Sequence, residues 1–286
     1  VILFTFSSCG NGDAGGGQTP SPGNASPDSY FVWEDESTKS VVTSLSAEGL
    51  QQKSIVFPAS VTVVQYAGIS ETLESVAFAN PDTQIQGMSF LSCTNLKSFT
   101  FPQNTVLVAE NVLAYCEALE EIVIPDGVTT IEHDAFHGCT SLKKVKFGSS
   151  LELIDKDAFM GCSALESLEI PALKEIGRNA FRECSSLKSV SLPEGLEIIG
   201  DSAFYENTAL ESINLPQTLK TAGSSIFSFC SSLGQVEIPA SLETAGYSAF
   251  DTLSLATKYR VKEGSYADLN YVDITGDRDG TQKEYY

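Results

Sequence analysis

Apolar residues return at a fixed interval over most of the chain. From residue 90 to residue 250 one large apolar residue recurs every 22 or 23 positions, and an isoleucine or valine stands five positions before most of them. The recurring residues are Phe90, Leu113, Phe136, Phe159, Phe181, Phe204, Phe227 and Phe250. A period in this range is typical of a solenoid, in which a single coil cannot bury its own apolar face and stacked coils share a continuous core.

Each unit also carries a shorter pattern that predicts a strand. A leucine six positions after the aromatic residue opens the pattern L-x-x-[VILF]-x-[ILF], as in "LEEIVIP" (119–125) and "LESINLP" (210–216). Alternation of apolar and polar residues turns one face of a strand inward. Proline then ends the strand, because it has no N–H for the ladder of the next coil. The "AFxxC" segment before the leucine predicts a tight helical turn that closes the coil.

The repeat unit "IPxGVTTIxxDAFxGCxSLxxVxIP" resembles the BspA-type leucine-rich repeats of bacterial surface proteins, over residues 50–257. The resemblance implies a leucine-rich-repeat-like solenoid: a single elongated domain of strand-dominated coils of about 23 residues with short helical turns. It also implies an N-terminal cap at 30–49 and a C-terminal cap and tail at 258–286. Departures from the pattern are Gly148 in place of a proline, Leu113 in place of a phenylalanine, and a degenerate stretch at 65–84. For function, the resemblance implies surface display and adhesion-like binding of proteins or glycans, with no catalytic residues.

Charges alternate at the position that follows the strand-opening leucine. This position reads Lys97, Glu120, Lys143, Glu166, Lys188 and Glu211 in successive units. Stacked coils would place these opposite charges side by side, which favours the correct register, whereas like charges in every coil would repel. We interpret the alternation as a control of register and solubility, not as a ligand site.

The chain begins with "VILFTFSSCG", which resembles the end of a bacterial lipoprotein signal peptide. In this interpretation residues 1–9 are a truncated signal segment, Cys9 of the relaxed lipobox receives the lipid, and the Gly/Ser/Pro-rich residues 10–29 are a flexible tether. Acyl chains would then hold an exported protein at the outer membrane or cell surface. The alternative is a fragment that starts inside an ordinary hydrophobic strand.

Composition narrows the choice of partners. The 286 residues are 42% hydrophobic and carry a formal net charge of −20. Such an acidic chain is a poor partner for nucleic acid, whose phosphates attract lysine and arginine, or for anionic lipid. We therefore expect an extracellular protein or polysaccharide as ligand, a membrane attachment through the lipid alone, and no cofactor. Composition gives no oligomeric state.

Cysteines occupy one slot of the repeat, three positions after the recurring apolar residue. The slot holds Cys93, Cys116, Cys139, Cys162, Cys184 and Cys230, with Asn207 in one unit. Neighbouring coils would bring adjacent slots within disulfide range, so pairs such as Cys139–Cys162 are geometrically feasible. A slot that accepts either cysteine or asparagine favours a small buried group bonded to nearby backbone. Zinc is disfavoured because no C-x-x-C pair occurs.

Three further features of the sequence are candidate chemical sites. His133 and His137 have a spacing that can bind metal on a helix, but the equivalent positions in other units vary, which favours exposed, uncommitted histidines. Asp277, Asp279 and Gly280 match part of a calcium loop that lacks two ligand oxygens, which favours a solvated terminal turn. No nucleophile motif such as G-x-S-x-G is present, so we expect no enzyme.

The outward residues of the predicted strands are the remaining candidates for a ligand. The set is Lys144, Lys146, Ser167, Glu169, Ser189, Ser191, Ser212, Asn214, Gln235 and Glu237. Small polar residues in a row would form a flat hydrogen-bonding surface, and Lys143, Lys144 and Lys146 are a basic cluster on an acidic protein. The favoured function is a non-catalytic cell-surface binding or adhesion module. The alternatives are a glycan-capture accessory of a nutrient-uptake system, which predicts clustered exposed aromatic residues, and a scaffold or stalk for another domain. Residues that merely face solvent remain an equal interpretation of this surface.

Overall fold

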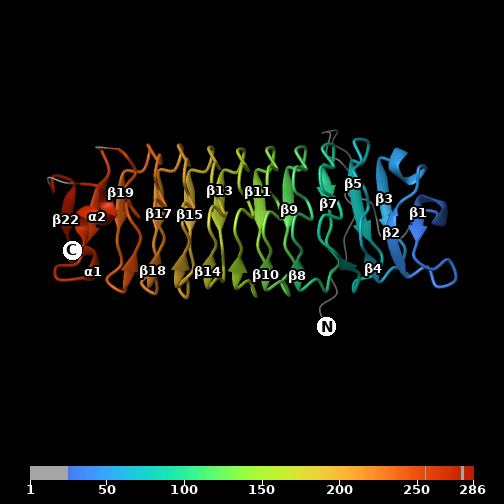
Figure 1. Cartoon of the computed structure of the whole chain (residues 1–286), viewed down its shortest axis with the longest axis horizontal. Coiled ribbons are helices and arrows are strands. Elements are labelled where there is room, and N and C mark those ends of the chain that lie inside the picture. Colours follow the sequence, from blue (N-terminus) through green and yellow to red (C-terminus); the bar gives the residue numbers. More distant parts are fainter. Residues whose placement is uncertain (1–24, 255, 278–279) are drawn as a thin grey trace, which may run out of the picture.

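The protein is an elongated solenoid whose coils stack along one axis (Figure 1). The computed structural model describes residues 25–254, 256–277 and 280–286, so the predicted lipid-attachment residue Cys9 lies outside the described residues. Within the coils, each turn of the chain contributes one strand to each of two rows. This architecture confirms the predicted repeat solenoid with a spacing of about 23 residues.

The first row, which we call the long-strand face, consists of the strands that follow the leucine of each unit. Its members pair in parallel within four separate sheets. They are β3 (Ser54–Phe57), β5 (Ser75–Phe78), β7 (Ser98–Phe99), β9 (Glu121–Val123), β11 (Lys144–Lys146), β13 (Ser167–Glu169), β15 (Ser189–Ser191), β17 (Ser212–Asn214), β19 (Gln235–Glu237) and β21 (Lys258–Val261). The three-residue strands from β9 to β17 show the burial pattern of one inward residue between two outward ones, as the period-two alternation predicts.

The second row, the short-strand face, consists of two-residue strands around the second apolar position of each unit. Seven of them form one continuous parallel sheet from β8 to β20. The members are β4 (Val63–Val64), β6 (Gln84–Ile85), β8 (Leu107–Val108), β10 (Thr130–Ile131), β12 (Leu153–Ile154), β14 (Glu175–Ile176), β16 (Ile198–Ile199), β18 (Thr221–Ala222) and β20 (Thr244–Ala245).

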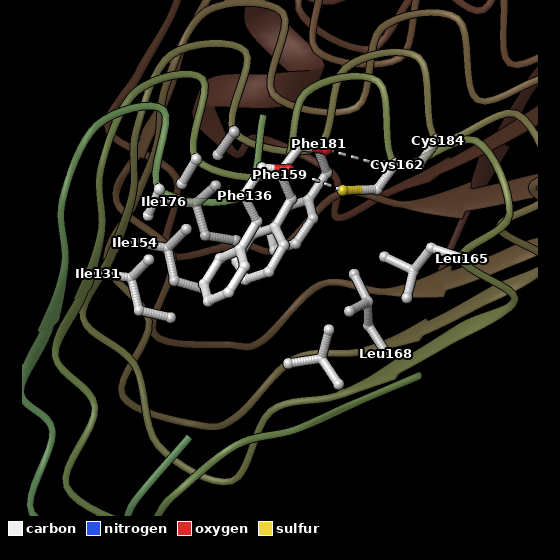
Figure 2. Packing of buried hydrophobic residues seen from close by; sticks show 14 of the residues in the cluster. Ile131, Phe136, Ile154, Phe159, Cys162, Leu165, Leu168, Ile176, Phe181 and Cys184 are labelled. Atoms are coloured by element: carbon white, nitrogen blue, oxygen red, sulfur yellow. Dashed lines mark hydrogen bonds between the residues drawn. The ribbon is translucent and has the colours of Figure 1, made fainter. Parts of the chain in front are cut away.

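Equivalent side chains form files through the core. The rings of Phe136 and Phe159 stack with centroids 4.9 Å apart, and those of Phe159 and Phe181 with centroids 5.3 Å apart. Figure 2 shows this aromatic file beside a parallel file of isoleucines. All these side chains are fully buried in a single cluster that runs between the two faces. The spacing is close to that of stacked strands, so the core is built by repetition of one packing unit.

The "AFxxC" segment is a succession of tight turns instead of a continuous helix. Amide groups bond to the carbonyl three residues earlier, for example Cys139 N–H to Phe136 O at 3.2 Å. Positive φ occurs directly before the segment at Asp134, with 57°, and within it at Gly138, with 70°. Aspartate, asparagine and glycine tolerate this left-handed conformation better than other residues, but it interrupts a helix.

Both ends of the stack are covered by additional elements. At the N-terminal end, η1 (Asp28–Tyr30) leads into β1 (Phe31–Trp33), which pairs antiparallel with β2 (Val41–Leu45), and η2 (Gly49–Gln51) follows. At the C-terminal end, α1 (Tyr266–Leu269) and α2 (Tyr271–Thr275) precede β22 (Lys283–Tyr285), which pairs with β21. No helix in the described part of the chain is long and apolar enough to span a membrane.

Candidate binding surfaces

Parallel pairing brings the sequence-predicted ligand residues to the long-strand face in register. Ser167, Ser189 and Ser212 form one file, and Glu169, Ser191 and Asn214 form the next. The remaining members of the set lie on the same face, on β11 and β19. Every residue of the set is exposed except Glu237, which is partly exposed and bonds Arg260 at 2.8 Å. The structure therefore gathers the predicted residues into one polar surface.

A shallow hollow of about 450 Å³ interrupts this surface between β11 and β13. Its lining includes Lys144, Lys146, Glu169 and Ser191, together with Phe147. Strands β11 and β13 belong to different sheets, so the ladder is broken at this point. The unit that follows is one residue shorter than its neighbours, with 22 residues between Phe159 and Phe181. The broken ladder and the shortened repeat unit thus occur at the same place as the hollow.

Lysines beside the hollow differ in their availability to a ligand. Lys143 Nζ is bound to Glu120 Oε2 at 2.9 Å, and this ion pair raises the pKa of Lys143. Lys144 and Lys146, by contrast, are exposed, and neither forms an ion pair with another described residue. The basic cluster therefore offers two free ammonium groups rather than three.

The predicted alternation of charge is confirmed for part of the stack. Lys97 and Lys53 both bind Glu74, at 2.8 and 2.7 Å, and hydrogen bonds from these two lysines lower the pKa of Glu74 to about 2. Further along the same file, Glu166, Lys188 and Glu211 form no ion pair with any described residue. A second alternating file, not foreseen from the sequence, lies before the short strands, where Lys174 binds Glu152 at 2.8 Å and Lys220 binds Glu197 at 3.0 Å.

Exposed aromatic residues on the edge formed by the tight turns, which we call the turn edge, include Tyr115 and Phe229, five repeat units apart, and sequence reasoning missed them. A hollow of about 620 Å³ there is lined by Gly138, Gly161, Phe229 and the hydroxyl residues Thr140, Ser163, Ser185 and Thr208. Phe229 is 44% exposed and packs edge-on against Tyr205. Tyr115, 45% exposed, lies over Gly138, where a side chain would clash with its ring. Tyr115 and Phe229 occupy the position two residues after the recurring apolar residue, and Tyr205 the position one residue after it, so an alignment of the units would have revealed them.

The six described cysteines are free thiols, as the structural interpretation predicted. Each Sγ donates a hydrogen bond to a backbone carbonyl of the preceding coil, for example Cys162 to Phe136 O at 3.3 Å (Figure 2). Burial raises the pKa of Cys139 and Cys184 to about 12. These thiols remain protonated and carry no nucleophilic chemistry at neutral pH.

The expectation of exposed, uncommitted histidines is wrong. His133 is half-buried, with Nε2 at 2.6 Å from Glu110 and Nδ1 at 3.1 Å from Asp134. His137 Nδ1 lies 2.9 Å from the other oxygen of Asp134. Hydrogen bonds to Asp134 and Glu110 raise the pKa of His133. The stacking of coils brings Glu110 of the preceding coil to His133, whereas Asp134 belongs to the same unit as both imidazoles.

The expectation of a solvated terminal turn is also wrong at Asp277. Its side chain is buried and accepts hydrogen bonds from the Tyr271 hydroxyl at 2.7 Å and from Gln282 N–H at 2.9 Å. Burial and the adjacent Asp277 raise the pKa of Tyr271. Asp279 lies outside the described residues, and the described ones contain no cluster of three or more histidine, cysteine or acidic residues that could hold a metal ion.

Comparison with known proteins identifies the repeats. The family model of the BspA type leucine rich repeat region matches residues 47–166 and 152–264, with six copies. No curated protein matches the chain. Among solved structures, the leucine-rich-repeat protein TpLRR of T. pallidum is similar, with 26% identity over 73% of this chain and 91% of that chain, and a TM-score of 0.56. A leucine-rich-repeat protein from Bacteroides ovatus is 17% identical over 86% of this chain and 88% of that one, with a TM-score of 0.42.

Proposed function

Because the chain belongs to the BspA-type leucine-rich-repeat family, we propose that it is a non-catalytic cell-surface binding or adhesion module. Its long-strand face would present an extended polar surface to an extracellular protein or polysaccharide. The observation that carries this proposal is the exposed polar file from β11 to β19, interrupted by a hollow with two unpaired lysines. Extended surfaces of stacked repeats are the usual binding surfaces of solenoid proteins.

The test compares two charge-matched double variants. Lys144→Ala/Lys146→Ala removes the free ammonium groups of the hollow. Lys174→Ala/Lys220→Ala removes the same charge from the other side of the coil, where both lysines are already paired with glutamates. Binding is measured on a panel of extracellular-matrix proteins and on a glycan array. We expect the first variant to weaken binding by about tenfold or more and the second to leave it nearly unchanged. A chain that binds nothing on either panel would instead support the scaffold or stalk alternative.

The turn edge favours a second candidate function, glycan capture. Sugar rings pack on aromatic side chains, and the hydroxyls of a glycan suit the threonine and serine groups that line the hollow beside Phe229. The exposed aromatic residues Tyr115 and Phe229 lie on the turn edge, five repeat units apart, and not on the long-strand face. Tyr115→Ala/Phe229→Ala should abolish signals on the glycan array while leaving protein binding intact. Glycan binding that survives in this variant would refute the assignment.

We further propose the layout of an anchored protein. Residues 1–9 would end a lipoprotein signal segment, Cys9 would carry the lipid, and 10–29 would be a tether. Caps at 30–49 and 258–286 would enclose the repeats at 50–257. Acyl chains would then hold the solenoid at the outer membrane or cell surface. Expression with a complete signal segment and a radiolabelled fatty acid should label the natural sequence and not Cys9→Ser, and equal labelling of both would exclude the anchor.

A further inference from the structure

The short-strand face has a gap between β6 and β8. Strand β6 ends the sheet that begins at β1, and β8 starts the next sheet, so the two strands do not pair although their coils are neighbours. In the next coils, Glu132 N–H bonds Val108 O and Asp155 N–H bonds Ile131 O, both at 2.9 Å. The corresponding bond from Ala109 N–H to Ile85 O is not made. Since Ala109 is buried, its amide lacks the partner that buried backbone groups normally have.

The sequence explains why the ladder opens at this point. Three residues before the second apolar position, the regular coils bury a valine or leucine: Val128, Leu151, Leu173, Leu196 and Leu219. In the two coils that flank the gap this position is held by Asp82 and Thr105. Asp82 is exposed, and the hydroxyl of Thr105 turns back to Pro102 O at 2.7 Å. Two successive polar substitutions thus remove the apolar contacts that close the coils elsewhere.

A cavity of about 690 Å³ occupies the gap, which we call the slot. It is bounded at both ends by bonds between the coils, from Asn104 N–H to Pro81 O and from Met88 N–H to Glu110 O, each 2.9 Å. Two apolar side chains at its rim face solvent: Val106 is 64% exposed and Leu107 is 42% exposed. Exposed apolar residues beside an open sheet edge are typical of a surface that a partner covers.

The charge of the slot restricts what can occupy it. Asp82, Glu110 and Glu132 line it, and no lysine or arginine is among its lining residues. Within this set Asp82 accepts a hydrogen bond from Asn104 at 2.6 Å, and Glu110 is paired with His133 at 2.6 Å. An anionic ligand would be repelled, and the described residues provide no metal-binding cluster. Aromatic platforms for a sugar are absent from the lining residues.

We propose that the slot binds an extended peptide segment that carries lysine or arginine side chains. The peptide backbone would meet the open edge at Ile85 and Ala109, as in recognition by strand addition. Apolar residues of the peptide would cover Val106 and Leu107, and an ammonium or guanidinium group would pair with Glu110 or Glu132. This site lies on the opposite side of the coil from the proposed ligand surface and is independent of it.

The experiment uses the full chain and two labelled peptides, one with alternating lysine and valine and one with alternating glutamate and valine. Leu107→Lys places a positive charge at the rim. Thr130→Lys makes the same change at the register partner of Leu107 in the next coil, outside the slot. Fluorescence anisotropy should show that the lysine peptide binds the natural sequence, that Leu107→Lys weakens binding by about tenfold or more, and that Thr130→Lys changes it by less than about twofold.

A second variant tests whether weaker peptide binding could result from misfolding. Thr105→Val restores an apolar residue at the position where regular coils have one, so it should raise the thermal unfolding midpoint while lowering affinity for the lysine peptide. Equal binding of both peptides, or equal effects of the two lysine substitutions, would overturn the proposal. Lys144→Ala/Lys146→Ala should retain peptide binding, so failure at the slot and failure at the long-strand face are distinguishable.

Discussion

The repeat position that holds the cysteines shows how contacts with the preceding coil determine the residue type. Cys116, Cys139, Cys162 and Cys230 each donate from Sγ to a carbonyl 26 residues earlier, at 3.1–3.4 Å. Asn207 makes the same bond through Nδ2 to Phe181 O at 3.1 Å. Its Oδ1, however, is buried without a hydrogen-bond partner. This repeat position therefore requires one small hydrogen-bond donor and provides no partner for a hydrogen-bond acceptor.

We predict that Asn207→Cys stabilises the protein. The substitution keeps a donor to Phe181 O and removes a buried orphan oxygen, whose desolvation costs about 1–3 kcal/mol. A thiol donates more weakly than an amide, so we expect a net gain of about 1 kcal/mol in the free energy of unfolding. Urea denaturation measures it, with Ser212→Cys as a control for an added exposed thiol. A lower stability of Asn207→Cys would show that the Oδ1 atom has an unrecognised partner.

At the scale of the structural element, the cysteines form a file of buried thiols across the coils. Burial raises the pKa of Cys139, Cys184 and Cys230 to about 12, from an ordinary value of 9.0. At a pH between these two pKa values, a thiol of the unfolded chain loses its proton while the same thiol in the folded protein keeps it. The folded state then binds more protons than the unfolded state, so stability is complete below pH 9 and falls as the pH rises toward 12.

The prediction is a steep alkaline loss of stability that depends on the number of buried thiols. Each thiol whose pKa differs between the two states should contribute about 1.4 kcal/mol per pH unit within this window. Cys139→Ala should therefore show a shallower decline of the unfolding free energy between pH 9 and 11, even though it is less stable at pH 7. Lysines also titrate in this range, but they are the same in both proteins. Parallel slopes for the two proteins would contradict the assignment.

The strands and turns also show how much of the structure the repeat period of the sequence can predict. The period placed the aromatic file and the inward residue of strands such as β9 and β13, because every coil repeats the same packing. It did not predict the breaks between β6 and β8 or between β11 and β13, since hydrogen bonds between coils depend on small shifts in loops. The contact of His133 with Glu110 and the burial of Asp277 were missed for a related reason: the partners lie in the preceding coil in the first case and in the C-terminal elements in the second.

For the whole molecule, the ends of the stack decide whether it remains a single particle. A stack of parallel strands has an open edge at each end, and such edges pair with other chains. Strand β22 covers β21 at one end, and β1 covers β2 at the other (Figure 1). The ring of Phe31 on β1 also packs against Phe57, with centroids 5.2 Å apart. The N-terminal hairpin therefore conceals both a strand edge and the first aromatic residues of the core.

We predict that deletion of residues 1–34 causes self-association, whereas deletion of 1–24 does not. The longer deletion removes β1 and leaves β2 as an uncovered edge beside Phe57, so two chains could pair through these edges or aggregate. The shorter deletion leaves every described element in place and serves as the control. Size-exclusion chromatography with light scattering should show a shift from one chain to two or more for the longer deletion only. A longer deletion that stayed monomeric, with an unchanged unfolding midpoint, would mean that the coil formed by β2 and β3 closes the stack by itself, and that the antiparallel hairpin contributes nothing to keeping the molecules apart.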